Sequence, residues 1–169
     1  MLARARSLLP VIRREPRETA ALREVAAIAA SATPISDPLQ RILEAALPVL
    51  PSDHLVLVHV SIDRSESVIL AAAGTASVWR WLRGPLGRGI AARAIETREV
   101  QVASGAVGAP DTAAGLSRLD IVVPVIHQGG VFGGLATADE SRRFTKRHVA
   151  LLRAFADQCA IGIDNAWGR

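Results

Sequence analysis

The sequence of 169 residues has little cysteine, few aromatic residues and no long apolar run. Its single cysteine, Cys159, cannot form a disulfide bond within the chain. A membrane-spanning helix needs about 18 consecutive apolar residues, which the chain lacks, and the N-terminus lacks the apolar core of a secretory signal peptide. These absences predict a soluble protein in a reducing compartment, the cytoplasm, with no membrane partner.

The charge of the chain is basic but dispersed. Twenty basic and 16 acidic residues give a formal net charge of +4, and nearly all of the basic residues are arginine. We find no basic stripe with interleaved aromatic residues of the kind that single-strand binders use. A nucleic-acid partner is therefore not expected. The Arg-rich first fourteen residues match a transit peptide only superficially, because arginine is enriched throughout.

A stretch near the C-terminus combines two strand-like runs with an amphipathic helix. Residues 119–126 and 131–137 are rich in β-branched residues, and the turn sequence His-Gln-Gly-Gly at residues 127–130 joins them as a hairpin. A helix follows from Phe144, with apolar residues every three or four positions along one stripe. The stripe consists of Val149, Leu152, Ala156, Cys159, Ile163 and Ala166.

A helix with a narrow apolar stripe is predicted at residues 17–32. Helices of this kind often pair with another helix. Prolines then interrupt the chain, and Ser36 or Asp37 caps a second helix over residues 39–47. The stripe of the first helix consists of Ala21, Leu22, Val25, Ile28, Ala29 and Ala32.

The middle of the chain alternates strand-like runs with turn residues. With the hairpin and the last helix, this order predicts an α+β domain whose antiparallel sheet has helices on one side. We expect this domain at residues 37–169, after an N-terminal helical extension at residues 1–36 that serves dimerisation. The predicted elements of the middle are strands at 54–62 and 67–73, an irregular segment at 74–89, a helix at 90–97, a strand at 99–103 and a mobile loop at 104–115.

Several short segments, in this order, resemble those of GAF domains. Each one is only a turn or a buried strand, so their joint order carries the resemblance, which covers about residues 38–166. The segments are GRGI at 87–90, TREV at 97–100, LDIVVPV at 119–125, GVFGGL at 130–135 and the helix that starts near Phe144 and ends in IDNA at 163–166.

The resemblance implies a six-stranded antiparallel sheet with flanking helices, and a pocket on the sheet face opposite the terminal helix. GAF domains commonly serve as small-molecule sensors and dimerising modules. We therefore expect a sensory or regulatory domain that binds a small molecule of unknown identity, with no defined cofactor. We also expect a homodimer through the N- and C-terminal helices and a possible separate output protein. The alternative is a ligand-free interaction module whose pocket is filled by its own side chains.

Five residues are candidate ligand contacts. The indole of Trp79 or Trp81 stacks on a planar ligand if their segment covers the pocket; otherwise one plugs the core and the other lies on the surface. His59 either faces the pocket, where it could ligate haem, or is a hydrogen-bonded strand histidine. Arg118 and Asp120 lie two apart at the start of a strand and share one face, where they line the pocket or stay solvated.

Catalysis is not predicted. Methionine sulfoxide reductases with the GAF fold use several cysteines, whereas Cys159 lies alone on an apolar stripe, which is typical of a small buried residue and also argues against bilin attachment. Only the dipeptide Asp139-Glu140 matches the signature of cyclic-nucleotide-binding relatives. We find no nucleophile with a base and no histidine pair at metal-ligand spacing, and we expect His127 and His148 to be solvated. A haem or cyclic-nucleotide sensor is a third possibility.

Overall fold

The computed structural model describes residues 16–26, 28, 36–103, 119–139 and 143–167. The expectations for residues 1–15, for the loop at 104–115 and for Arg118 lie outside this part of the chain. Residues 16–26 and 28 form one helix, here called the N-terminal helix. The other helices are α2 (Ser36–Ala46), α3 (Ile90–Thr97) and α4 (Lys146–Trp167), with short 3-10 turns η1 (Leu47–Val49) and η2 (Ser77–Trp79).

Six antiparallel strands form one sheet in the order β3-β2-β1-β6-β5-β4, as the resemblance implies. The pattern alone predicted five of them. The sixth, β3, has only three residues, Arg-Gly-Pro, and so carries no strand pattern. The strands are β1 (His54–Val60), β2 (Glu66–Gly74), β3 (Arg83–Pro85), β4 (Gln101–Val102), β5 (Ile121–His127) and β6 (Gly130–Thr137).

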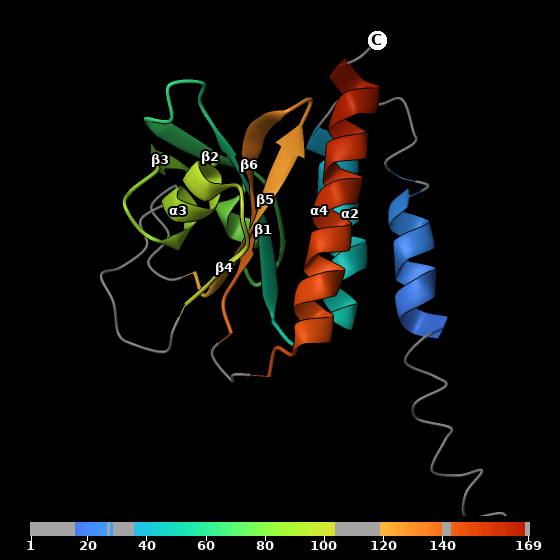
Figure 1. The fold of residues 1–169 in the computed structure, drawn as a ribbon. Helices are drawn as coiled ribbons and strands as arrows, with labels where there is room; N and C mark the ends of the chain where they lie inside the picture. The colour runs from blue at the N-terminus through green and yellow to red at the C-terminus, as the bar shows by residue number, and fades with distance from the viewer. Residues whose placement is uncertain (1–15, 27, 29–35, 104–118, 140–142, 168–169) are drawn as a thin grey trace, which may run out of the picture.

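Both faces of the central strand β1 are buried. Leu55 and Leu57 belong to one apolar cluster, whereas Val56 and Val58 belong to another on the opposite face. The first cluster lies under α2 and α4, and the second lies under α3, so we call these the α4 face and the α3 face (Figure 1). Helices therefore flank the sheet on both sides, which corrects the expectation that they lie on one side only.

The α4 face holds the larger core. The apolar stripe of α4 packs inward, and Leu152, Cys159 and Ile163 have no exposed surface. Burial of each leucine or isoleucine contributes roughly 1.5–3 kcal/mol. The N-terminal helix lies outside α2 and α4 (Figure 1), where its Val25 and Ile28 join the same cluster.

The described residues of the two stripes that we interpreted as dimer contacts thus pack within the chain. Val25 and Leu152 are both fully buried in the single chain. At the surface of this layer, the guanidinium of Arg147 donates to Glu18 and ties α4 to the N-terminal helix. A dimer built on the terminal helices would therefore have to use their outer surfaces. No helix in the described part of the chain is long and apolar enough to cross a membrane.

Candidate functional site

The α3 face is where the resemblance places a ligand pocket. Gly89 leads into α3, which packs over β5 and β6. The buried side chains of this face are at most 7% exposed, and Ile90, Ala92 and Val131 pack against them partly buried. The cluster consists of Val56, Val58, Val60, Ile69, Ala72, Ala76, Leu86, Ala91, Ala94, Ile95, Leu119, Val122 and Ala136.

Trp79 lies at the edge of the α3 face. It ends the short turn η2, which follows Ala76 of the cluster, and its side chain is 39% exposed. Its indole meets the imidazole of His54 edge to face, with 6.3 Å between ring centroids. His54 in turn donates from Nδ1 to Asp53 over 2.8 Å, and this hydrogen bond lowers the pKa of Asp53.

Trp81 has a different environment, although it lies two residues away. Its φ of 75° is in the left-handed region, which bulky side chains rarely adopt. The backbone N–H of Trp81 donates to the carbonyl of Ile69 over 2.7 Å. The guanidinium of Arg80 lies 4.8 Å from the ring centroid of Trp81, at cation–π distance. More than half of the Trp81 side chain is exposed.

His59 lies on the α4 face, in register with Leu55 and Leu57 and away from the two tryptophans. Its Nδ1 donates to the carbonyl of Phe132 over 2.8 Å, and the two rings lie 4.2 Å apart. Burial lowers the pKa of His59, although the hydrogen bond to Phe132 opposes this effect. The sheet therefore separates His59 from the face on which the resemblance places the pocket.

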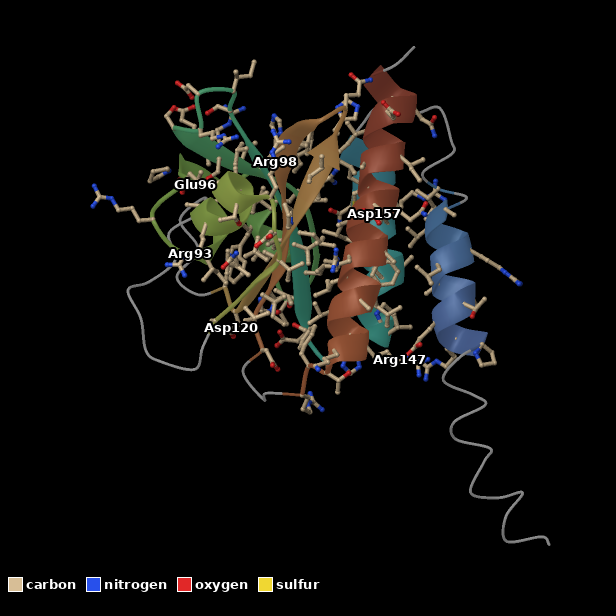
Figure 2. The ribbon with its side chains drawn as sticks, viewed as in Figure 1. Arg93, Glu96, Arg98, Asp120, Arg147 and Asp157 are labelled. Carbon is tan, nitrogen blue, oxygen red and sulfur yellow. The ribbon has the colours of Figure 1, made fainter. Side chains whose placement is uncertain are left out.

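Asp120 lies where the chain enters β5, at the lower end of the sheet in Figure 2. Its Oδ2 accepts from the backbone N–H of Asp139 over 2.6 Å, and its own N–H donates to the carbonyl of Thr137. Asp120 thus fastens the start of β5 to the segment after β6. Of the four candidate residues that the structure describes, only Trp79 and Trp81 lie near one another, because they are two apart in the sequence.

A link between the hairpin and α4 was missed from the sequence. Nε2 of His127 donates to Oδ1 of Asp164 over 3.0 Å, and the side-chain amide of Gln128 donates to the same oxygen over 3.1 Å. Contrary to our expectation of a solvated side chain, His127 is only 14% exposed. No sequence pattern indicates this contact, because Asp164 lies 37 residues from His127.

A groove of about 430 Å³ lies between the N-terminal helix and α2, away from the sheet. Its walls are mainly small apolar side chains, and two arginines and two glutamates border it. These charges balance one another, so the groove has no preference for an ion of either sign. It is lined by Arg17, Ala20, Ala21, Glu24, Ile28, Arg41, Glu44, Ala45, Pro48 and Val49.

The thiol of Cys159 is unsuited to act as a nucleophile. It is fully buried, and burial raises its pKa to about 12, so the thiolate is not formed near neutral pH. Within the described ranges, no group of three or more His, Cys, Asp or Glu residues could hold a metal ion. The features of the α3 face that a ligand could contact are therefore its apolar cluster and Trp79 at its edge.

A family model described as a GAF domain matches residues 32–164. The chain belongs to the GAF domain family. This assignment agrees with the strand order and with helices on both faces, and it places the chain in a sensory and regulatory family. A comparison with curated proteins found no match.

Several solved structures share the fold. The GAF domain of a phosphoenolpyruvate-protein phosphotransferase from Coxiella burnetii has a TM-score of 0.70 at 22% identity, over 87% of this chain and 92% of that one. The free methionine-R-sulfoxide reductase from Neisseria meningitidis has a TM-score of 0.71 at 20% identity, over 88% and 89%. The phycoerythrobilin-bound GAF domain of a cyanobacterial phytochrome has a TM-score of 0.67 at 14% identity, over 88% and 95%. At these identities, the likeness establishes the fold alone.

Proposed function

We propose that this GAF domain is a non-catalytic sensory or regulatory module that binds a small molecule between α3 and the sheet. The observation that carries the proposal is the unequal packing of the two faces. Ala91 and Ala94 bury only methyl groups, Ile95 is the one large side chain of α3 that is fully buried in the cluster, and Ile90 packs against it only partly buried. Because buried area sets the strength of the contact, α3 is held less firmly than α4 and can move to admit a ligand.

Trp79 supports this site from its edge. The side chain lies beside His54, and Ala76 of the same segment belongs to the α3-face cluster. A planar ligand that entered under α3 would meet an indole face at this edge. Trp81, Asp120 and Arg118 stay proposed contacts of the ligand. His59 lies on the α4 face, so such a ligand would affect it only by shifting strand β1.

The route from this site to an output runs through the β5–β6 hairpin. Both strands lie under α3, and the tip of the hairpin contacts α4 through Asp164. A ligand that displaced α3 would alter the packing of these strands and, through the tip, the end of α4. Coupling of this kind requires that the ligand bind the two arrangements with different affinity.

The alternative function is a ligand-free interaction module, and one observation favours it. The central residues of the α3 face, Val56, Val58 and Val122, are at most 2% exposed, so the domain's own side chains already cover this face. In that case the face is a closed core, and regulation works through protein contacts alone. Trp79 and Trp81 are too exposed to be the residues that fill it.

A thermal-shift screen with nucleotides, haem, amino acids and aromatic acids separates the two functions. A sensor should show a dose-dependent rise in Tm for at least one class, because a ligand of the native state stabilises it. Ala94→Leu should remove that rise by filling the site, whereas Glu96→Leu, on the exposed side of α3, should retain it. No rise in Tm with any of the four ligand classes would favour the interaction module. Haem or cyclic-nucleotide binding, the third possibility, would appear in the same screen.

We also propose that the domain forms a homodimer through the outer surfaces of its helical layer. The support is an exposed Ile161 on α4, 45% accessible, together with the open groove beside the N-terminal helix. Ile161→Glu should weaken association and leave the Tm of the dilute monomer unchanged, whereas Val102→Glu, on the edge strand β4, should leave association intact. Val25 and Leu152 are poor positions for this test because they lie in the core. A monomeric mass in light scattering at high concentration would rule the dimer out.

A further inference from the structure

The connection between β2 and β3 exposes a run of apolar side chains. Val78, Trp79, Trp81 and Leu82 are 81%, 39%, 53% and 42% exposed, within five consecutive residues. Large exposed apolar side chains grouped in this way mark interaction sites more often than chance, and tryptophan is among the residues that dominate binding energy at interfaces. Residues 78–83, which also include Arg80 and Arg83, are called the Trp–Arg segment below.

The Trp–Arg segment is held in place and is not merely a surface loop. Two backbone hydrogen bonds join it to Ile69. The N–H of Trp81 donates to the carbonyl of Ile69 over 2.7 Å, and the N–H of Ile69 donates to the carbonyl of Leu82 over 2.9 Å. Nε of Arg80 donates to the carbonyl of Leu70 over 3.1 Å. These bonds keep Trp81 in a left-handed backbone conformation that its side chain disfavours. Strain of this kind persists where the surroundings impose it, and it is concentrated at functional positions.

The charge around this segment is positive. Between residues 67 and 95 the chain has no Asp or Glu, and it has arginine at positions 80, 83, 88 and 93. The carboxylates that flank this run in the sequence are Glu66, which lies opposite Pro85 in the ladder, and Glu96 of α3, while Asp53 accepts from His54. An anionic partner is therefore complementary to the segment, and a cationic one is not.

We propose that the Trp–Arg segment binds an acidic peptide segment of another protein, with apolar side chains between the acids. The arginines would meet the carboxylates, and Trp81 and Leu82 would hold the apolar anchors. The site goes beyond the proposed sensor function and does not depend on it. Among the described strands, β3 pairs with β2 alone and stands at the edge of the sheet, the kind of position where an extended peptide adds as a further strand.

A peptide fits these residues better than single-stranded nucleic acid, the other anionic polymer that stacks on tryptophan. One face of Trp81 already carries the guanidinium of Arg80, so a base has only the other face of this ring on which to stack. Val78 and Leu82 offer aliphatic surface, which suits apolar side chains and gives no stacking platform. Pro85 also limits the edge of β3 to a short contact, which suits a short linear segment.

The test is a selection from phage-displayed random dodecapeptides against the whole chain, followed by affinity measurement on the recovered peptides. We expect peptides enriched in Asp and Glu around an apolar residue. Trp81→Gly should weaken them roughly thirtyfold or more, as for a hot-spot tryptophan, while it keeps or raises Tm because glycine accepts the left-handed conformation. Arg83→Glu should weaken them about tenfold through charge reversal, and Arg153→Glu on α4 is the control that should not.

Three results would overturn the proposal. Recovered peptides without an acidic bias would remove the charge argument. Equal binding by the chain and by its Trp81→Gly variant would place the contact elsewhere. Tighter, Trp81-dependent binding of a fifteen-nucleotide oligothymidylate than of any peptide would assign the segment to nucleic acid. The Ala94→Leu variant, which tests the small-molecule site, should bind the peptides normally, so failure of one proposal does not mimic failure of the other.

Discussion

Cys159 shows how one buried side chain affects the pH dependence of the whole domain. The thiol has no exposed surface and its pKa is raised to about 12 because the core does not solvate a thiolate. In the unfolded chain the same thiol ionises near its ordinary pKa of 9.0. Above pH 9 the unfolded state therefore loses a proton that the folded state retains, and stability falls as pH rises toward the folded pKa.

We predict a loss of about 1.4 kcal/mol per pH unit above pH 9 from this thiol. Urea unfolding at pH 8, 9 and 10 measures it. The chain is favourable for the experiment because it has no tyrosine, and Lys146 is its only lysine. Cys159→Ala should cost about 1 kcal/mol at pH 7 and flatten the alkaline decline. An equal decline in the variant would mean that another group causes it.

The sequence predicted the environment of some candidate residues and not of others. Helical spacing was enough to place Cys159 in the core, because the α4 stripe has a polar opposite side. His59 could not be assigned to a face, because β1 is apolar on both sides and its pattern does not say which side meets α4. The contacts of Asp120 with Asp139 and Thr137 depend on the return of β6, which no local pattern encodes.

At the scale of elements, the close approach of β1 and β6 depends on Gly133. A Cβ built there would lie 1.8 Å from the carbonyl oxygen of Val58, which is backbone and cannot move aside. We predict that Gly133→Ala separates these central strands and costs more than about 4 kcal/mol, an exceptional value for a point substitution. Circular dichroism and urea unfolding check it.

Two other glycines of the same hairpin provide the controls. Gly130→Ala should be tolerated, because the nearest atom to its Cβ is 3.7 Å away. A Cβ at Gly129 would have no atom within 4 Å, but the backbone there has a φ of 78°. Gly129→Ala should therefore lower the free energy of unfolding only by the backbone strain, about 1 kcal/mol. Similar costs at all three positions would contradict the steric argument.

The contact of the hairpin tip with α4 is a second prediction at this scale. Asp164→Ala removes the acceptor shared by His127 and Gln128, so amide exchange should accelerate in the last turn of α4 and at the hairpin turn. The change in global stability should stay below about 1 kcal/mol, because the carboxylate is partly exposed. Asp157→Ala, also exposed on α4 (Figure 2), is the control and should leave exchange at the hairpin unchanged.

Elements with their own pattern were predictable and those without one were not. The helix expected at residues 90–97 is α3, and the hairpin expected at residues 127–130 is the turn between β5 and β6, with positive φ at residues 128 and 129. The strand expected at residues 99–103 is shorter, with two paired residues in β4. The apolar stripe of α3 fits either face of the sheet. The residues of α3 therefore could not predict that this helix packs on the face opposite α4.

At the scale of the molecule, the N-terminal helix is part of the core although the matched family region begins at residue 32. Removing residues 1–31 exposes the surface that Val25 and Ile28 cover. We predict a fall in Tm on the order of 10 °C, from two buried side chains worth roughly 1.5–3 kcal/mol each. Differential scanning calorimetry measures it.

The ion pair at the surface of this helix gives the matched comparison. Glu18→Gln removes the negative charge that pairs with Arg147 but leaves the apolar contact, and a single pair with a half-exposed partner contributes less than about 1 kcal/mol. Its Tm should therefore change little. An unchanged Tm in the shortened chain as well would show that the helix does not stabilise the domain. Prediction at this scale was partial, because the stripe indicated a partner helix without showing that the partner lies in the same chain.

The placement of Trp79 and Trp81 has an optical consequence. They are two of the three tryptophans, the chain has no tyrosine, and the large fully buried side chains among the described residues are aliphatic or phenylalanine. Much of the ultraviolet emission of the protein therefore originates beside β3, where solvent reaches both indoles. A change in the wavelength of that emission would therefore report binding at this surface in real time, without an attached label.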